Sequence, residues 1–412
     1  MSLQPYWIFS QRWADGGFWH DKIREKDIPT TMHFNNWGFA QDFDYELVPD
    51  ADYLRRYGKH PGERLVVLTG ASVVLSVGAT SDENTISAQL QRHLNEKSGG
   101  VRYRVINIAM GSWLAYQEFV AISLFAMPLN PDWIVTFDGI NDASAPCLFG
   151  SGAVNPMEWP KLLYLTYGGT GISSPLLGTL ARHSALVRLM SGLRPDEAAG
   201  GLRKPADADH LMVDNTETDW QFSVRLDNVT TGVEDKQVSF YLNAERDILS
   251  LFNRANIMLT TQPLYDDNPA APSYRAAVGP TGGADPAAVE LELDKYMEAH
   301  KNDPCAPRAK LDDARLRGYF MARSATRLAA LVDAAQQADR TRRIIYRNAE
   351  GALPYEDKLR RKFFVDYVHF TDLGHSRVAE FLAENIIASD RGVPFDFASF
   401  ARHSQEIAAA AP

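Results

Sequence analysis

Four short polar blocks contain the residues that could do chemistry in this chain. They are Gly70-Ala71-Ser72, the stretch 107–112, the stretch 139–142 and the stretch 366–375. The first offers a serine hydroxyl, and the last offers a histidine with a carboxylate three residues before it. A serine becomes a nucleophile when an imidazole takes its proton, and a carboxylate can orient that imidazole. The blocks therefore predict acyl chemistry at a serine.

Each residue of this constellation has its own expected role. Ser72 is the expected nucleophile, His369 the general base, and Asp366 the group that orients the base. The negative oxygen that develops during attack on an ester needs hydrogen-bond donors aimed at it. The expected donors are the backbone N–H groups of Ser72 and Gly111 and the side-chain amide of Asn141.

Two other polar residues of these blocks have simpler interpretations. His375 competes with His369 as the base, but it follows Gly374 and is expected in the first turn of the last helix, where a histidine is usually buried or capping. Asp142 is expected to accept hydrogen bonds from nearby backbone N–H groups. The other histidines show no spacing typical of metal ligands, so no metal site is predicted.

An alternation of strand-like and helix-like segments must position these blocks. The expected strands are Leu65–Thr69, Val101–Ile108, Trp133–Phe137, Ile257–Thr261 and Arg343–Tyr346. The expected helices are about Asn84–Leu94, Tyr116–Ala126, Val238–Asn253, Leu311–Ala338 and Leu373–Ile387. Unbroken apolar strands that alternate with helices predict a parallel sheet, and ligands bind at the carboxyl edge of such a sheet. The first, second and third strands each lead into one of the polar blocks at this edge.

In this order, the four blocks resemble the SGNH hydrolases, the GDSL esterase and lipase superfamily. Gly-x-Asn-Asp at 139–142 and Asp-x-x-His at 366–369 are the specific parts, and Asn107 with Tyr116-Gln117-Glu118 is similar to the family's second block. The resemblance covers most of the alternation from Leu65 to the last helix. It implies a three-layer αβα sandwich with a five-stranded parallel sheet of the flavodoxin-like type.

The same resemblance implies ester hydrolysis or acyl transfer by a serine, without a cofactor. Carried over by position, Ser72, Asp366 and His369 form the triad, and Gly111 and Asn141 contribute to the oxyanion hole. Ala71 departs from the family, whose Gly-Asp-Ser has a carboxylate there that braces neighbouring loops. The family's oxyanion glycine also usually lies five residues after the second-block asparagine, and Ser112 occupies that place, so Ser112 is an alternative donor to Gly111.

Long irregular stretches surround the expected sheet. Residues 1–60 are expected to form an irregular lead-in packed on the hydrolase-like domain, which takes up residues 61–412. Two insertions, at about 143–235 and 264–309, are expected over the active-site edge, where long loops of α/β enzymes usually shape the binding site. Trp159, Tyr164 and Tyr167 of the first insertion could form a wall for an acyl chain or sugar ring, or the insertion's own small core.

Composition restricts the partners of the chain. A net charge of −10 argues against a nucleic-acid partner, because phosphate binding needs a basic surface. No apolar run is long enough to predict a membrane span. Cys147 and Cys305 are either unrelated free thiols or one long-range disulfide, and a disulfide would favour an extracytoplasmic compartment, periplasmic or secreted.

The sequence therefore predicts a serine esterase. By analogy with the resembled family, its substrate is expected to be a short acyl ester, such as an acetyl ester, of a carbohydrate or similar alcohol. An O-acyltransferase that passes the acyl group to a polysaccharide would use the same residues. A catalytically inactive relative that binds a glycan is the third alternative.

Overall fold

The computed structural model describes the parts of the chain that form the sheet and the helices packed on it. These are residues 39–40, 55, 57–111, 113–142, 233–251, 254–265, 310–354, 356–365 and 368–411. The chain divides into one compact unit of residues 1–144 and 234–412 and a second unit of residues 145–233, and the sheet lies in the first. Most of the expected lead-in and of the two expected insertions lies outside the described residues, as do Cys147 and Cys305.

A five-stranded sheet forms the centre of the first unit, and all its neighbouring strands are parallel. Its spatial order is β2 (Arg102–Asn107), β1 (Glu63–Gly70), β3 (Trp133–Asp138), β4 (Asn256–Thr261) and β5 (Ile344–Asn348). β1 and β3 are buried almost throughout, because each has strands on both sides and helices on both faces. The expected five-stranded parallel sheet is confirmed.

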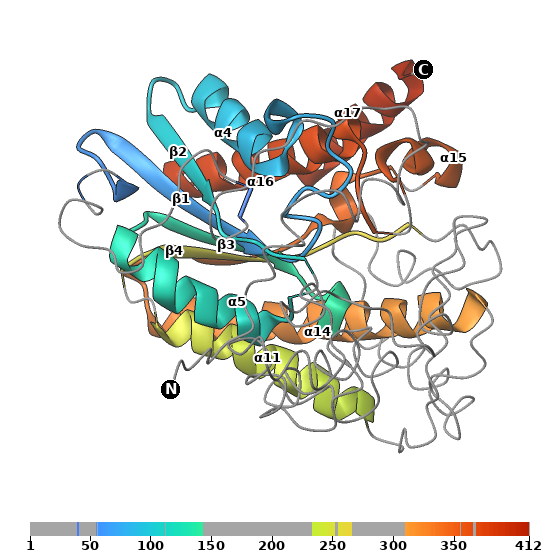
Figure 1. Ribbon diagram of the computed structural model, residues 1–412, viewed down its shortest axis with the longest axis horizontal. Coiled ribbons are helices and arrows are strands. Elements are labelled where there is room, and N and C mark those ends of the chain that lie inside the picture. The colour runs from blue at the N-terminus through green and yellow to red at the C-terminus, as the bar shows by residue number, and fades with distance from the viewer. Residues whose placement is uncertain are drawn as a thin grey trace, which may run out of the picture. The chain divides into compact units, whose positions relative to one another are not determined.

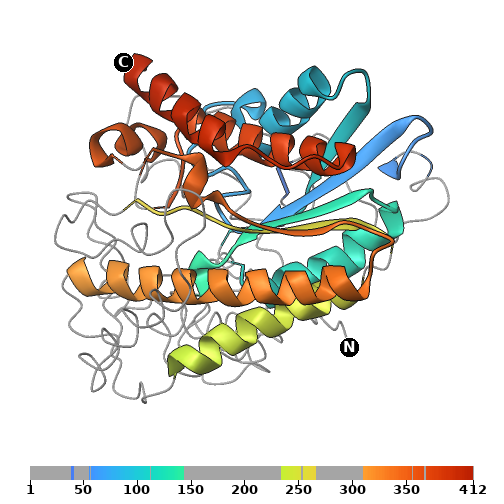
Figure 2. The same cartoon turned by 180° about the vertical axis from the view of Figure 1, so that it is seen from behind.

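Helices cover both faces of the sheet (Figures 1 and 2). One face is covered by α4 (Ile86–Lys97), α16 (Asp372–Arg391) and α17 (Phe397–Ala410). The other face is covered by α5 (Ala115–Ala121), α11 (Val233–Leu251) and α14 (Lys310–Ala338). The three-layer αβα arrangement is therefore confirmed, and it leaves the carboxyl ends of the strands free to carry the polar blocks.

Helix boundaries follow local capping. α4 begins at Ile86 because the Thr85 side chain accepts a hydrogen bond from the Ala88 N–H, and the preceding Asp82–Asn84 forms a separate 3-10 turn. α16 begins after Thr371, whose hydroxyl accepts from the Gly374 N–H, and it ends at Arg391, capped by Gly392 with φ +69°.

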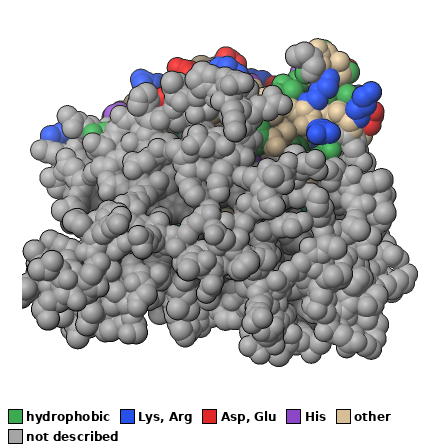
Figure 3. Space-filling model, turned by 45° about the vertical axis from the view of Figure 1, so that its right-hand side comes forward, with side chains coloured by type: hydrophobic (Ala, Val, Ile, Leu, Met, Phe, Trp, Pro, Cys, Tyr) green, Lys and Arg blue, Asp and Glu red, His purple; other side chains and the backbone are tan. Residues whose placement is uncertain are grey.

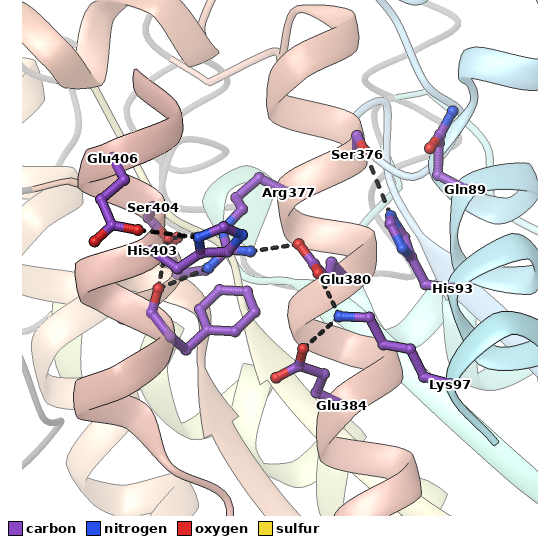
Figure 4. A network of polar contacts seen from close by, with 12 residues as sticks. Gln89, His93, Lys97, Ser376, Arg377, Glu380, Glu384, His403, Ser404 and Glu406 are labelled. Atoms are coloured by element: carbon purple, nitrogen blue, oxygen red, sulfur yellow. Dashed lines mark hydrogen bonds and ion pairs between the residues drawn. The ribbon is translucent and has the colours of Figure 1, made fainter. Parts of the chain in front are cut away.

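A polar network joins the three helices on the first face (Figure 4). Arg377 of α16 is buried and lies over the Phe400 ring of α17, with its guanidinium carbon 3.4 Å from the ring centroid. It also donates to the Ser404 hydroxyl at 2.7 Å and pairs with Glu380. Lys97 of α4 bridges to α16 through Glu380 and Glu384 (Figure 4). These bonds fix α16, and hence the loop that leads into it.

The described surface carries charges of both signs. On the face drawn in Figure 3, the described side chains gather at the upper margin, where Lys and Arg lie near Asp and Glu. Among the helices that the structure describes, none is long and apolar enough to cross a bilayer.

Candidate active site

Ser72 lies in a tight turn that follows β1. The turn begins at Gly70, where a Cβ would lie 2.5 Å from the Phe137 carbonyl oxygen and 2.4 Å from a methyl of Val74, so only glycine fits. The Val77 N–H donates to the Ser72 carbonyl at 3.0 Å and closes the turn. Ser72 is thus held at the carboxyl edge of the sheet, with 7% of its surface exposed.

The imidazole of His369 reaches this serine. Its Nε2 lies 2.8 Å from Ser72 Oγ, although the two residues are 297 positions apart in the chain. The side chain of His369 is almost fully buried. An imidazole at hydrogen-bond distance can take the hydroxyl proton and return it later, which is the arrangement needed for a serine nucleophile.

The loop that carries His369 is fixed from both sides. The Val365 N–H donates to the His369 carbonyl at 2.9 Å, and the Thr371 N–H donates to the Phe363 carbonyl at 3.0 Å. Across the site, the carboxylate of Asp372 accepts from the Thr80 N–H at 2.9 Å. This last bond links the loop after Ser72 directly to the start of α16.

Asn107, at the end of β2, ties the second block to the serine turn. Its side chain is fully buried, donates to the Val74 carbonyl and accepts from the Ala109 N–H, both at 2.8 Å. The Met110 N–H then donates to the Gly70 carbonyl at 3.3 Å. Gly111 directly follows Met110, so its backbone lies beside the turn that carries Ser72.

The third block joins the second through Asn141. The Asn141 Nδ2 donates to the Trp113 carbonyl at 2.9 Å, and the Trp113 N–H donates to the Met110 carbonyl at 3.4 Å. The Trp113 ring packs edge-on against Phe39, with their centroids 6.1 Å apart. Because an amide nitrogen carries two hydrogens, one remains for another acceptor after the bond to Trp113.

The structure therefore brings together Ser72 and His369, with Gly111 and Asn141 connected to them through short backbone segments. Asp366 and Ser112 lie outside the described residues, so the orienting carboxylate and the choice between Gly111 and Ser112 stay predictions. The same holds for the proposed aromatic wall of the first insertion.

The non-catalytic roles expected for Asp142 and His375 can be compared with the structure directly. Asp142 accepts from the Ala115 N–H at 3.2 Å, which confirms its backbone-binding role. His375 is fully buried in the first turn of α16 and lies edge-on to Phe370, with ring centroids 5.8 Å apart, so it is placed as a core residue.

Sequence reasoning missed a buried acidic cluster directly behind the third block. It consists of Glu118 of α5, Asp138 at the end of β3, and Tyr241 and Glu245 of α11, all at most 2% exposed. The Tyr241 hydroxyl donates to Asp138 Oδ1 at 2.6 Å. Burial is the main cause that raises the pKa of Asp138 to about 6 and the pKa values of Glu118 and Glu245 well above their ordinary range. The sequence did offer a signal for this cluster, because Glu118 and Glu245 each lie among the apolar residues of an expected helix.

Comparison with known proteins finds similarity only at the level of solved structures. No family model matches the chain, and no curated protein matches it. One similar structure is a gut microbial diltiazem-metabolizing enzyme, with 9% identity and a TM-score of 0.36, matched over 79% of this chain. The chain spans 47% of that enzyme's length.

Two other similar structures are matched over nearly their whole length. A GDSL-like lipase from Bacteroides thetaiotaomicron has 13% identity and a TM-score of 0.35, with 82% of this chain and 98% of that chain covered. An acetylxylan esterase from Geobacillus stearothermophilus has 12% identity and a TM-score of 0.35, with 82% of this chain and 97% of that chain covered.

Proposed function

We propose that this chain is a serine esterase of the SGNH type, which hydrolyses carboxylic esters through an acyl-enzyme on Ser72. The observation that carries the proposal is the 2.8 Å distance between Ser72 Oγ and His369 Nε2 at the carboxyl edge of a parallel sheet. The sequence predicts a nucleophile in one block and its base in another, distant block. In the structure the hydroxyl oxygen of the first and the imidazole nitrogen of the second lie at hydrogen-bond distance. An inactive glycan-binding relative would not need this hydrogen bond.

In the proposed mechanism, Ser72 attacks the ester carbonyl while His369 takes the hydroxyl proton. Asp366 orients the imidazole and stabilises its charged form. The developing oxyanion accepts hydrogen bonds from the backbone N–H groups of Ser72 and Gly111 and from the Asn141 amide. His369 then returns the proton to the leaving alcohol, and water releases the acyl group by the same steps in reverse order.

A short acyl group, such as acetyl, on a carbohydrate or similar alcohol is the proposed substrate. Ser72 and His369 are only 7% and 4% exposed, which favours a small group at the reacting carbon over a long chain. A series of p-nitrophenyl esters from acetate to octanoate tests the acyl preference, and kcat/KM should fall steadily with chain length. Equal or rising values along the series would contradict a small acyl site.

Two substitutions test the proposed chemistry. Ser72→Ala and His369→Ala should each abolish turnover of p-nitrophenyl acetate and labelling of the serine by a fluorophosphonate, with the fold intact. Ser324→Ala removes a buried hydroxyl that has no hydrogen-bond partner among the described residues, and His403→Ala removes an exposed histidine of α17, so both should retain full activity. Turnover that survives Ser72→Ala would overturn the proposal.

Transfer of the acyl group to a polysaccharide uses the same residues, and it is separated from hydrolysis by product analysis. The enzyme is incubated with an activated acetyl ester, with and without oligosaccharide, and the acetyl group is followed by mass. Free acetate in both mixtures supports an esterase. Acetylated oligosaccharide as the main product would identify a transferase.

A further inference from the structure

The buried acidic cluster lies between the sheet and the helices that cover one of its faces. Asp138 ends β3, Glu118 lies on α5, and Glu245 lies on α11 one turn after Tyr241. In the described part of the chain, no Lys or Arg forms an ion pair with any of the three carboxyl groups. Three fully buried carboxyl groups without a cation cannot all be ionised, because each charge would be both desolvated and repelled.

The hydrogen-bond pattern assigns the protons. Both oxygens of Glu118 and of Glu245 are buried, and within the described part of the chain no N–H or O–H donates to them. A protonated carboxyl group is itself a donor, and Asp138 lies within hydrogen-bond reach of both glutamates. Asp138 is also the carboxyl group to which Tyr241 donates, and the donors around it lower its pKa against the effect of burial. Asp138 is thus the anion, and Glu118 and Glu245 are the proton carriers.

The buried acidic cluster contacts both ends of the turn that carries Asn141. Asp138 is the residue before Gly139, which has φ +107° and would place a Cβ 3.0 Å from the sulfur of Met321. At the other end of the turn, Asp142 accepts from the N–H of Ala115, which begins the helix that carries Glu118. The contacts that hold the turn before Asn141, at Asp138, and after it, at Asp142, therefore involve the same group of buried residues.

We propose that Glu118, Asp138, Tyr241 and Glu245 are positioning residues that aim the Asn141 amide at the oxyanion by sharing buried protons. The proposal rests on the proposed esterase function. Glu118 and Glu245 each donate a carboxyl proton to Asp138, and the three donors around Asp138 fix the strand end from which the turn departs. Among the described residues, no group of these side chains is arranged to hold a metal ion.

A dependence on pH follows from this arrangement. The titratable groups around Asp138 are Glu118 from α5, Tyr241 and Glu245 from α11, Tyr346 from β5, and Asp142 from the turn itself. Burial raises the pKa of each of them, so an alkaline medium adds charges that repel Asp138. Loss of a shared proton removes a donor and loosens the turn. We expect kcat to fall on the alkaline side, with little change in KM.

A double-mutant cycle on kcat tests the proposal. Loss of an oxyanion donor lowers kcat by a factor of roughly 10²–10³. Glu118→Ala should cost a part of this factor, about tenfold or more in kcat, because it misaligns the donor without removing it. In the Asn141→Ala background the same substitution should cost less than about twofold, because the residue acts through Asn141. Glu118→Gln keeps a donor toward Asp138 and cannot ionise, so it should restore kcat and move the alkaline fall to higher pH. Glu63→Ala removes a buried glutamate at the opposite end of β1 and should leave kcat unchanged.

The outcomes separate this proposal from the proposed function. Turnover that survives Ser72→Ala overturns the esterase and the proposal with it. If Ser72→Ala is inactive but Glu118→Ala costs the same factor in both backgrounds, only the positioning role is overturned. Failure of Glu118→Gln to restore kcat likewise contradicts proton sharing. If Glu118→Ala does not fold, Tyr241→Phe replaces it in the same cycle, with the same expected coupling to Asn141.

Discussion

The backbones of Gly78 and Phe370 lie so close that a Cβ on Gly78 would be 2.2 Å from the Phe370 carbonyl oxygen. Gly78 follows the Ser72 turn, and Phe370 directly follows His369. The approach of these two segments is therefore what brings the serine and the imidazole within hydrogen-bond distance. Gly78 also has φ +102°, a conformation that glycine adopts more easily than other residues.

Gly78→Ala should lower both stability and activity. A left-handed conformation alone costs roughly 1–2 kcal/mol for a residue with a Cβ. The matched control is Gly100→Ala, because Gly100 has φ +104° and its Cβ would meet nothing within 4 Å. We expect Gly100→Ala to show the backbone cost alone in urea unfolding, with unchanged kcat. Gly78→Ala should unfold at lower urea and turn over more slowly, and equal behaviour of the two variants would contradict the close-approach argument.

Asn141→Ala should remove one oxyanion donor. The expected loss is roughly 2.7–4 kcal/mol of transition-state stabilisation, seen in kcat with KM little changed. Asn95→Ala is the control, since the Asn95 side chain of α4 also bonds to backbone, at Tyr103 near the start of β2 and away from the site. Steady-state kinetics on one ester checks both variants. A loss of less than tenfold at Asn141 would exclude the donor role.

Arg360→Met should destabilise the protein strongly. Arg360 is fully buried, lies 2.6 Å from Glu350 and donates to the Leu264 carbonyl at 2.7 Å. Breaking a buried ion pair from one side costs about 3–5 kcal/mol, because the remaining charge is left uncompensated. The double variant Arg360→Met/Glu350→Leu should recover most of this loss in urea unfolding. A double variant that is less stable than Arg360→Met would contradict this explanation.

Stability should fall as pH rises through the titration of the buried acids. The pKa values of Glu118 and Glu245 lie well above the ordinary value of 4.5, so the folded state holds protons that the unfolded state has released. Their contribution is complete below about pH 4.5 and is lost as pH passes the folded values. Glu118→Gln/Glu245→Gln should therefore flatten the free energy of unfolding between pH 5 and pH 9. Glu406→Gln, on the exposed side of α17, should leave the slope as in the wild type.

The sheet and the meeting of Ser72 with His369 could be predicted from the sequence for a simple physical reason. Apolar runs such as Leu65–Leu68 fit only strands buried on both faces, and parallel strands bring their carboxyl ends to one edge. The polar blocks that follow β1, β2 and β3 must then meet, whereas the stretch 366–375 follows no strand directly and was expected at the same edge from its Asp-x-x-His motif.

Other features depend on tertiary contacts that have no local pattern. Helix α17 is missing from the expected helices even though its apolar residues recur at helical spacing, and its docking relies on the contact between Phe400 and the Arg377 guanidinium. The acidic cluster was missed for a related reason. A glutamate such as Glu118 is normally a surface residue, and its burial here is stabilised by partners from two other elements.

The 297 positions between the hydroxyl and its imidazole have a consequence during synthesis. A ribosome that has completed the first strand and its turn has made the nucleophile but still has most of the polypeptide to assemble before the base emerges. The nascent chain therefore stays inert toward esters in its surroundings. The proposed hydrolysis can begin only when the last loop has folded back across the sheet, so the appearance of turnover would report that this loop has docked.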